Sequence, residues 1–261
     1  MPVSRLVIGC DDKTDIGAGA VVWDAWMQAA GNAFDTGFVY GGGRHETVPG
    51  QWIANRGVAK DIVVIVKGAH TPYCAPRAIS AQLDISLDRL GLDQAPVCIM
   101  HRDNSDIPAG EFVDALNRLH KPGRIGVFGG SNWPPARFAE ANAYATEHGL
   151  EPMRILNNNL SLAVIERPVW AGCITSNTAE ALAFLRKENV THLSWSSQAR
   201  GYFLPEPLRA CLPTLAPTPV SVAMPMPGAA AVPKRSRLAT ASAHTPSRRL
   251  GCLREAFHPS H

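Results

Sequence analysis

The chain has 261 residues, of which 46% are hydrophobic and 18% charged, and its formal net charge is +3. These values are ordinary for a globular protein of one domain, and they exclude fibrous and strongly charged disordered classes. No apolar run approaches the roughly 20 residues that a membrane-spanning helix needs, and the N-terminus lacks the basic-then-apolar order of a signal peptide, which predicts a cytoplasmic protein without a membrane partner.

The chain alternates apolar runs of strand type with segments of helical spacing. The runs are expected as strands at residues 5–10, up to Asp35, 61–68, 95–102, 125–128, 153–157 and 191–196. The helical segments are expected at residues 21–30, 45–56, 76–90, from 108 onward, 134–148 and 178–188, with Pro49 interrupting the second near its start. This alternation predicts a parallel sheet with right-handed crossovers, and this many units favours a (β/α)8 barrel.

Polar side chains stand at the ends of three of these strands. Asp35 ends the second strand, Lys67 stands at the end of the third and His101 at the end of the fourth, while Tyr40 lies in the loop after Asp35. Functional groups collect at the carboxyl ends of parallel strands, so a site is expected there. A buried lysine is expensive unless a carboxylate meets it, and Asp35 is placed to do so. For Asp35 and Lys67 alone, a structural ion pair stays the alternative.

Four residues, in their order and spacing, resemble the catalytic tetrad of the aldo-keto reductases: Asp35, Tyr40, Lys67 and His101. The resemblance continues through GVFGGSNW at 126–133, NNNLSLA at 157–163 and SWSSQARGYF at 194–203, and it stops after about Ala210. It implies a (β/α)8 barrel enzyme that uses NAD(P)H.

The resemblance implies a role for each member of the tetrad. Tyr40 would be the general acid that protonates the carbonyl oxygen while the nicotinamide delivers hydride to the carbonyl carbon. A free phenol, with a pKa of about 10, is a weak donor at neutral pH, so a nearby cation is needed, and Lys67 would supply it. Asp35 would hold Lys67 by an ion pair, and His101 would donate to or orient the substrate oxygen.

Seven further residues are implied as cofactor ligands: Ser131, Asn132, Asn157, Trp195, Ser196, Gln198 and Gly201. The first three would bond the carboxamide of nicotinamide, and Trp195 would stack on its ring. The last three lie in a loop that would follow the pyrophosphate. From the residues alone, helix capping by Ser131 and Asn132 and a core position for Trp195 stay open. The glycines at 41–43 lack the GxGxxG fingerprint and are expected to let the Tyr40 loop turn.

Cysteine and histidine spacing indicates neither a disulfide framework nor a metal site. The six cysteines form no CxxC pair, and the nine histidines show no HxxxH spacing. Two cysteines in apolar runs, Cys10 and Cys98, are typical of small core residues.

From about Cys211 the sequence changes character, because prolines recur among Ala, Ser and Arg and break every helical or alternating pattern. We expect residues 1–210 to form the barrel and residues 211–261 a disordered tail that proteases cut early; a changed reading frame near Ala210 is the other explanation. VSVAM at 220–224 is a candidate for a short eighth strand. The barrel is expected to lack a proper closing unit, which would leave the first and seventh strands with open edges.

The sequence therefore predicts an oxidoreductase that reduces an aldehyde or ketone, with NADP(H) favoured over NAD(H). The family's second segment for the cofactor phosphate has no convincing equivalent, because VPKRS at 232–236 comes too soon after the seventh strand. The expected partner is a small carbonyl substrate, with no nucleic acid despite the basic tail. Two alternatives stay open: a cofactor-binding relative without turnover that serves as a sensor or subunit, and a truncated product without function.

Overall fold

The computed structural model describes residues 2–165, 168–188, 190–205 and 220–222. The chain divides into two units, the first made of Met1–Asn158 and Thr178–Leu193, the second of Asn159–Asn177 and Ser194–His261. The predicted tail lies outside the described residues, apart from 220–222. In the part of the chain that the structure describes, no helix is long and apolar enough to cross a membrane.

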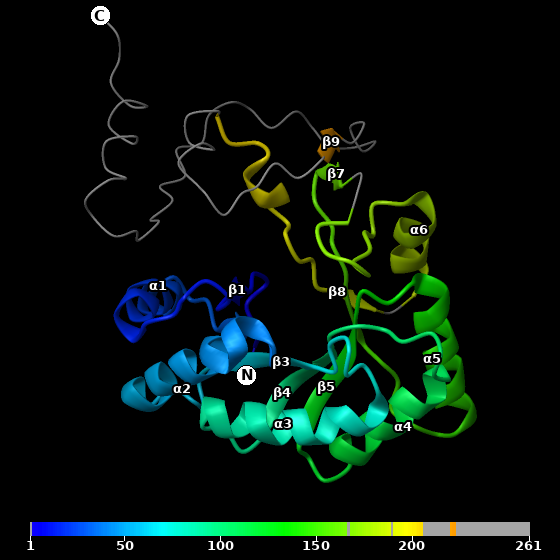
Figure 1. Ribbon diagram of the computed structural model, residues 1–261, viewed down its shortest axis with the longest axis horizontal. Helices are drawn as coiled ribbons and strands as arrows, with labels where there is room; N and C mark the ends of the chain where they lie inside the picture. The colour runs from blue at the N-terminus through cyan, green and yellow to red at the C-terminus, as the bar shows by residue number, and fades with distance from the viewer. Residues whose placement is uncertain (1, 166–167, 189, 206–219, 223–261) are drawn as a thin grey trace, which may run out of the picture. The chain divides into compact units, whose positions relative to one another are not determined.

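The first unit is built on a seven-stranded parallel sheet, drawn from blue to yellow in Figure 1. Its strands follow one another in the order β1 (Ile8–Gly9), β2 (Ala33–Asp35), β3 (Val63–Gly68), β4 (Ala95–Met100), β5 (Ile125–Ser131), β6 (Ile155–Asn157) and β8 (Thr191–His192). Each strand of this sheet pairs in parallel with the next strand of the sheet along the chain, as in a (β/α)8 barrel, and β7 is left out of the series. The barrel is incomplete: among the described residues, β1 and β8 each pair on one side only.

Within the described ranges, six α-helices accompany the sheet: α1 (Ile16–Gln28), α2 (Arg44–Arg56), α3 (Pro76–Leu90), α4 (Ala109–His120), α5 (Pro135–Glu147) and α6 (Ala179–Lys187). Local sequence sets their ends. The side chain of Asp15 accepts a hydrogen bond from Ala18 N at 3.0 Å and so caps α1. Gly91 closes α3 with a φ of 67°, which glycine adopts without strain. The helix predicted at residues 76–90 is confirmed with both ends.

Side chains of the strands alternate between two apolar layers. Val64 and Val66 of β3 belong to the large core between the sheet and its helices. The alternate residues face the other side of the sheet, where a smaller cluster contains Ile65, Ile99 and Ile155. This inner face is the interior of the barrel. The candidate site is formed by polar residues that follow the isoleucines along the same strands and point to the same face.

Several predicted boundaries are wrong by a few residues. The strands predicted at 5–10 and 191–196 have two residues each, because only those residues pair with a neighbour. Strand β5 runs on to Ser131, since its glycines continue to pair with β6. Helix α2 continues through Pro49, whose fixed φ suits a helix and whose missing N–H removes only one hydrogen bond.

The second unit contains a two-stranded antiparallel sheet. Strand β7 (Ala163–Ile165) pairs with β9 (Val220–Val222), in the register Ala163 to Val222. The prediction of an eighth barrel strand at 220–224 is therefore wrong for the three described residues. A short segment can add to any strand edge whose backbone groups lack partners, and here that edge is β7.

Candidate active site

Asp35, Lys67 and His101 occupy staggered positions on neighbouring strands. Asp35 pairs in register with Ile65, two residues before Lys67, and Lys67 pairs with Ile99, two residues before His101. Because side chains alternate with a period of two, all three point to the inner face. Strands of a barrel tilt, so residues that are offset in register reach one level. The barrel geometry thus gathers residues that lie far apart in sequence.

The structure brings all four tetrad candidates together. Lys67 Nζ lies 2.6 Å from Asp35 Oδ2 and 5.1 Å from the centre of the Tyr40 ring. The Tyr40 hydroxyl lies 3.4 Å from His101 Nε2, and the two rings meet edge-on with their centres 5.2 Å apart. The ion pair is therefore not an isolated structural contact, because a phenol and an imidazole adjoin it.

Three glycines turn the chain from Tyr40 into α2. Gly41, Gly42 and Gly43 have φ values of 53°, 63° and 98°, which lie in the left-handed region that favours glycine. The role predicted for them, to let the loop turn, is confirmed.

Burial and Lys67 act in opposite directions on the acid. Burial raises the pKa of Tyr40 above its ordinary value, although the Lys67 ammonium works to lower it. Lys67 acts in the predicted direction, toward a lower pKa of Tyr40, but burial outweighs its effect. Burial also opposes the charge on Lys67, yet the Asp35 carboxylate and the Tyr40 phenol raise the pKa of Lys67 above its usual range. Tyr40 therefore keeps its proton at neutral pH beside a charged lysine.

His101 is neutral at neutral pH. Its pKa lies well below the ordinary value because burial, then Lys67 and His70, disfavour the imidazolium. The rings of His70 and His101 meet edge-on with their centres 4.7 Å apart. The Nδ1 of His70 lies 2.8 Å from the carbonyl oxygen of Thr71, and because a carbonyl oxygen only accepts, this contact fits a protonated Nδ1. Sequence reasoning missed His70, although its place just after the end of β3 is the kind of signal that identified the others.

Three cofactor candidates lie at the ends of β5 and β6. Ser131, the last residue of β5, pairs in register with Asn157. Asn157 donates from Nδ2 to Leu193 O at 2.7 Å, while its Oδ1 is buried without a hydrogen-bond partner. Asn132 Nδ2 donates to Ser131 Oγ at 3.0 Å. Neither residue caps α5, whose N-cap is Pro134. A buried acceptor with no donor fits the NH₂ of a carboxamide such as that of nicotinamide.

The other four cofactor candidates lie in the second unit: Trp195, Ser196, Gln198 and Gly201. Asn159 Nδ2 donates to Trp195 O at 3.0 Å, and the rings of Trp195 and Trp170 lie 6.1 Å apart. Trp195 is half-buried rather than a fully enclosed core residue. These four residues are not part of the unit that holds the tetrad.

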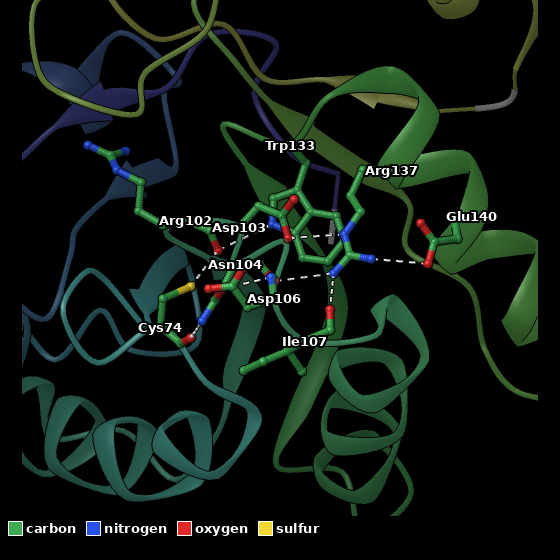
Figure 2. Close-up of polar contacts among 9 residues, drawn as sticks. All are labelled: Cys74, Arg102, Asp103, Asn104, Asp106, Ile107, Trp133, Arg137 and Glu140. Carbon is green, nitrogen blue, oxygen red and sulfur yellow. Dashed lines mark hydrogen bonds and ion pairs between the residues drawn. The ribbon is translucent and has the colours of Figure 1, made fainter.

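A network around Arg137 of α5 fastens the loop that follows His101 (Figure 2). The Arg137 guanidinium contacts four groups: Asp103 Oδ1 at 3.3 Å, Glu140 Oε1 at 3.0 Å, Asn104 O at 3.3 Å and Ile107 O. It also lies 5.6 Å from the centre of the Trp133 ring. Arg137 thus holds the loop after β4 through one side chain, that of Asp103, and through two backbone carbonyl oxygens.

The carbonyl oxygen of Arg102, next to His101, is a second node of this network (Figure 2). It accepts hydrogen bonds from Trp133 Nε1 at 3.3 Å and from Cys74 Sγ at 3.1 Å. The loops after β3, β4 and β5 are therefore tied to one another beside the tetrad. Contacts between residues so far apart in sequence leave no periodic signal, so sequence reasoning could not find them.

Replacing Arg137 with Met is expected to lower the free energy of unfolding by about 1–3 kcal/mol, because charged hydrogen bonds are lost and Asp103 loses its cation. Equilibrium unfolding in urea would measure the loss. Replacing Glu140 with Gln is the matched control: its carboxylate is exposed, and a change within about 0.5 kcal/mol is expected. Equal losses in the two variants would contradict an anchoring role for Arg137.

Comparison with known proteins decides the family. The sequence profile of the Aldo/keto reductase family matches residues 18–208. The chain belongs to the aldo/keto reductase family. Members of this family are oxidoreductases that in general use NAD(P)H.

Three fungal proteins that are similar to this chain are longer than it is. Norsolorinic acid reductase B of Aspergillus parasiticus is 26% identical over 168 residues, 59% of this chain and 44% of the relative. Norsolorinic acid reductase of Aspergillus flavus is 22% identical over 212 residues, 74% of this chain and 50% of the relative. A protein of Schizosaccharomyces pombe, provisionally named a voltage-gated potassium channel subunit beta, is 31% identical over 137 residues, 49% of this chain and 39% of the relative. The chain thus spans about half the length or less of these relatives.

Proposed function

We propose that the protein reduces an aldehyde or ketone to an alcohol by hydride transfer from NAD(P)H, with Tyr40 as general acid. The observation that carries the proposal is the convergence of the phenol, the lysine–aspartate pair and the imidazole at adjacent strand ends, with Tyr40 3.4 Å from His101. Two relatives that are named as reductases lend support.

Each residue of the tetrad has a task in this reaction. The hydride for the carbonyl carbon would come from NAD(P)H, whose carboxamide Ser131, Asn132 and Asn157 would hold. Tyr40, protonated at neutral pH, gives its proton to the carbonyl oxygen as negative charge develops there. Lys67, held by Asp35, stabilises the phenolate that remains. His101 is neutral and close to the Tyr40 hydroxyl, so an oxygen that bonds Tyr40 lies within reach of its Nε2.

The proposed cofactor ligands follow from the same arrangement. Ser131, Asn132 and Asn157 would hold the carboxamide, since Asn157 Oδ1 is a buried acceptor without a donor. The candidates of the second unit are assigned to the ring face and the pyrophosphate: Trp195, Ser196, Gln198 and Gly201. We favour NADP(H) over NAD(H) as the natural cofactor.

Cofactor titration tests the proposal directly. Adding NADPH should quench tryptophan fluorescence, and the same sample should oxidise NADPH when an aromatic aldehyde is added. The preference for NADPH over NADH should stay below the roughly hundredfold that a buried phosphate–Arg clamp gives, because the family's second phosphate-binding segment is not evident in the sequence. A preference of that size or more would contradict this expectation and place basic residues of the tail at the 2′-phosphate.

A second candidate function is cofactor binding without turnover, as a sensor or subunit. The similarity to a protein named as a channel subunit favours it. Fluorescence quenching without carbonyl reduction would support this candidate over the first. Absence of quenching at saturating NADPH would contradict both, and would favour a truncated product without function.

A further inference from the structure

An ion pair between a partly exposed arginine and a buried glutamate adjoins the loop that carries Tyr40. Glu46, in the first turn of α2, has a fully buried side chain, and Arg89 near the end of α3 places its NH1 2.9 Å from Glu46 Oε2. The same NH1 donates to the carbonyl oxygen of Phe38 at 3.1 Å. The guanidinium also stacks over the Phe38 ring, 4.7 Å from its centre. One side chain of α3 is therefore joined both to α2 and to the Tyr40 loop.

The backbone of Phe38 is fixed from both sides. Its N–H donates to the carbonyl oxygen of Lys67 at 2.9 Å, and its C=O accepts from Arg89. Tyr40 follows two residues later, and its N–H donates to Gly37 O at 2.9 Å. The direction of the Tyr40 side chain is thus set by a peptide held between the catalytic strand β3 and Arg89.

Two glycines provide the space that Arg89 needs. A Cβ on Gly43 would collide with the Arg89 guanidinium, and a Cβ on Gly50 would collide with the backbone of Arg89 and Leu90. Gly43, which helps to turn the chain after Tyr40, therefore also leaves room for the Arg89 guanidinium next to the loop. Arg89 therefore needs glycine at both positions to keep its place against Glu46 and Phe38.

We propose that Arg89, held by Glu46, is a positioning residue that fixes the Tyr40 loop in the geometry needed for proton transfer to the substrate. The inference rests on the proposed function of Tyr40 as general acid. Rates of such steps are steep in distance, and a displacement of about 1 Å lowers them on the order of a hundredfold. The contacts of Arg89 with the carbonyl oxygen and ring of Phe38, called here the Arg89 clamp, would limit displacements of that size.

Replacing Arg89 with Lys tests the contacts with Phe38 separately from the positive charge that faces Glu46. Lysine keeps a cation for the buried Glu46, but its compact ammonium lacks the planar guanidinium that stacks on the Phe38 ring while NH1 bonds Glu46 and the Phe38 carbonyl oxygen. We expect faster amide hydrogen exchange in peptides covering residues 36–44, a kcat lower by about 10- to 100-fold, and an unchanged Kd for NADPH. Replacing Phe38 with Leu removes only the stacking ring, and it serves as a second variant if Arg89→Lys fails to fold.

The matched control is Arg124→Lys, an exposed arginine paired at 2.6 Å with Asp84 of α3. It should leave both the exchange of the Tyr40 loop and kcat unchanged. A merely structural role for Arg89 would lower Tm but leave kcat intact well below the transition. An unchanged kcat in both Arg89→Lys and Phe38→Leu, folded and saturated with NADPH, would overturn the inference.

The two readouts separate this inference from the proposed function. If the parent protein shows no carbonyl reduction but Arg89→Lys loosens residues 36–44, the clamp stands and the proposed function of the site fails. If the parent is active and neither exchange nor kcat responds to Arg89→Lys, the proposed function stands and the positioning role fails.

Discussion

Replacing Tyr40 with Phe is expected to reduce carbonyl turnover by about 100- to 10,000-fold, the range that a positioned general acid contributes. The phenyl ring keeps its place against His101 and over Lys67, so the only group lost is the hydroxyl that lies 3.4 Å from His101 Nε2. Because that hydroxyl acts on the substrate oxygen and not on the dinucleotide, NADPH affinity should stay close to that of the parent.

Two measurements with one control decide the role of Tyr40. NADPH oxidation in the presence of an aldehyde gives kcat, and fluorescence titration gives the cofactor Kd. Tyr144→Phe is the matched control, because it removes the hydroxyl of a tyrosine on α5 that bonds Asp114 at 3.2 Å. Turnover of Tyr40→Phe within a few fold of the parent would rule Tyr40 out as the acid.

Replacing Lys67 with Met is expected to impair both rate and stability. Met removes the cation that stabilises the Tyr40 phenolate, and it leaves the Asp35 carboxylate without the partner now at 2.6 Å. Breaking a buried ion pair from one side lowers the free energy of unfolding by about 3–5 kcal/mol. The pKa of Lys67 is raised in the folded state, so the contribution of the lysine to stability is present at neutral pH and is lost as pH rises through that raised pKa. At the acid end the pair is lost when Asp35 takes up a proton, and burial raises the pKa of that carboxyl.

A double variant separates the two losses. Lys67→Met with Asp35→Asn removes the unpaired charge, so part of the stability measured by urea unfolding should return. The rate should not return, because no cation adjoins Tyr40. Recovery of kcat in the double variant would show that Lys67 acts on folding alone and not on the phenol.

Local patterns in the sequence were sufficient for the order of strands and helices and for most of the tetrad. Apolar runs predicted the parallel strands, and their polar ends identified Asp35, Lys67 and His101, because a strand that emerges from a core must place its first polar group at the edge. Tyr40 stands in a loop, and its role came from the family resemblance. The end of α3 before Gly91 and the start of α6 after Thr178 agree with capping preferences that act within a few residues.

Short strands and strand partners were decided by tertiary structure. Strand β8 has two residues and β9 three, so neither carries enough alternation for its pairing to be predicted. Residues 220–222 pair antiparallel with β7 because a distant edge is open to them, which no local pattern encodes. The predicted tail outside those residues stays a prediction.

The sequence by itself indicated the residues that we propose for the chemistry, and the tertiary structure decided what holds those residues in place. Arg89 bonds Glu46 across 43 positions of sequence, and Arg137 pairs with Asp103 across 34. Each arginine lies on a helix whose pattern explains only its apolar face, so its partner depends on how helices pack against strand-end loops. The physical reason is range: periodicity and capping act within a few residues, whereas a long charged side chain bonds whatever group the fold brings within about 3 Å.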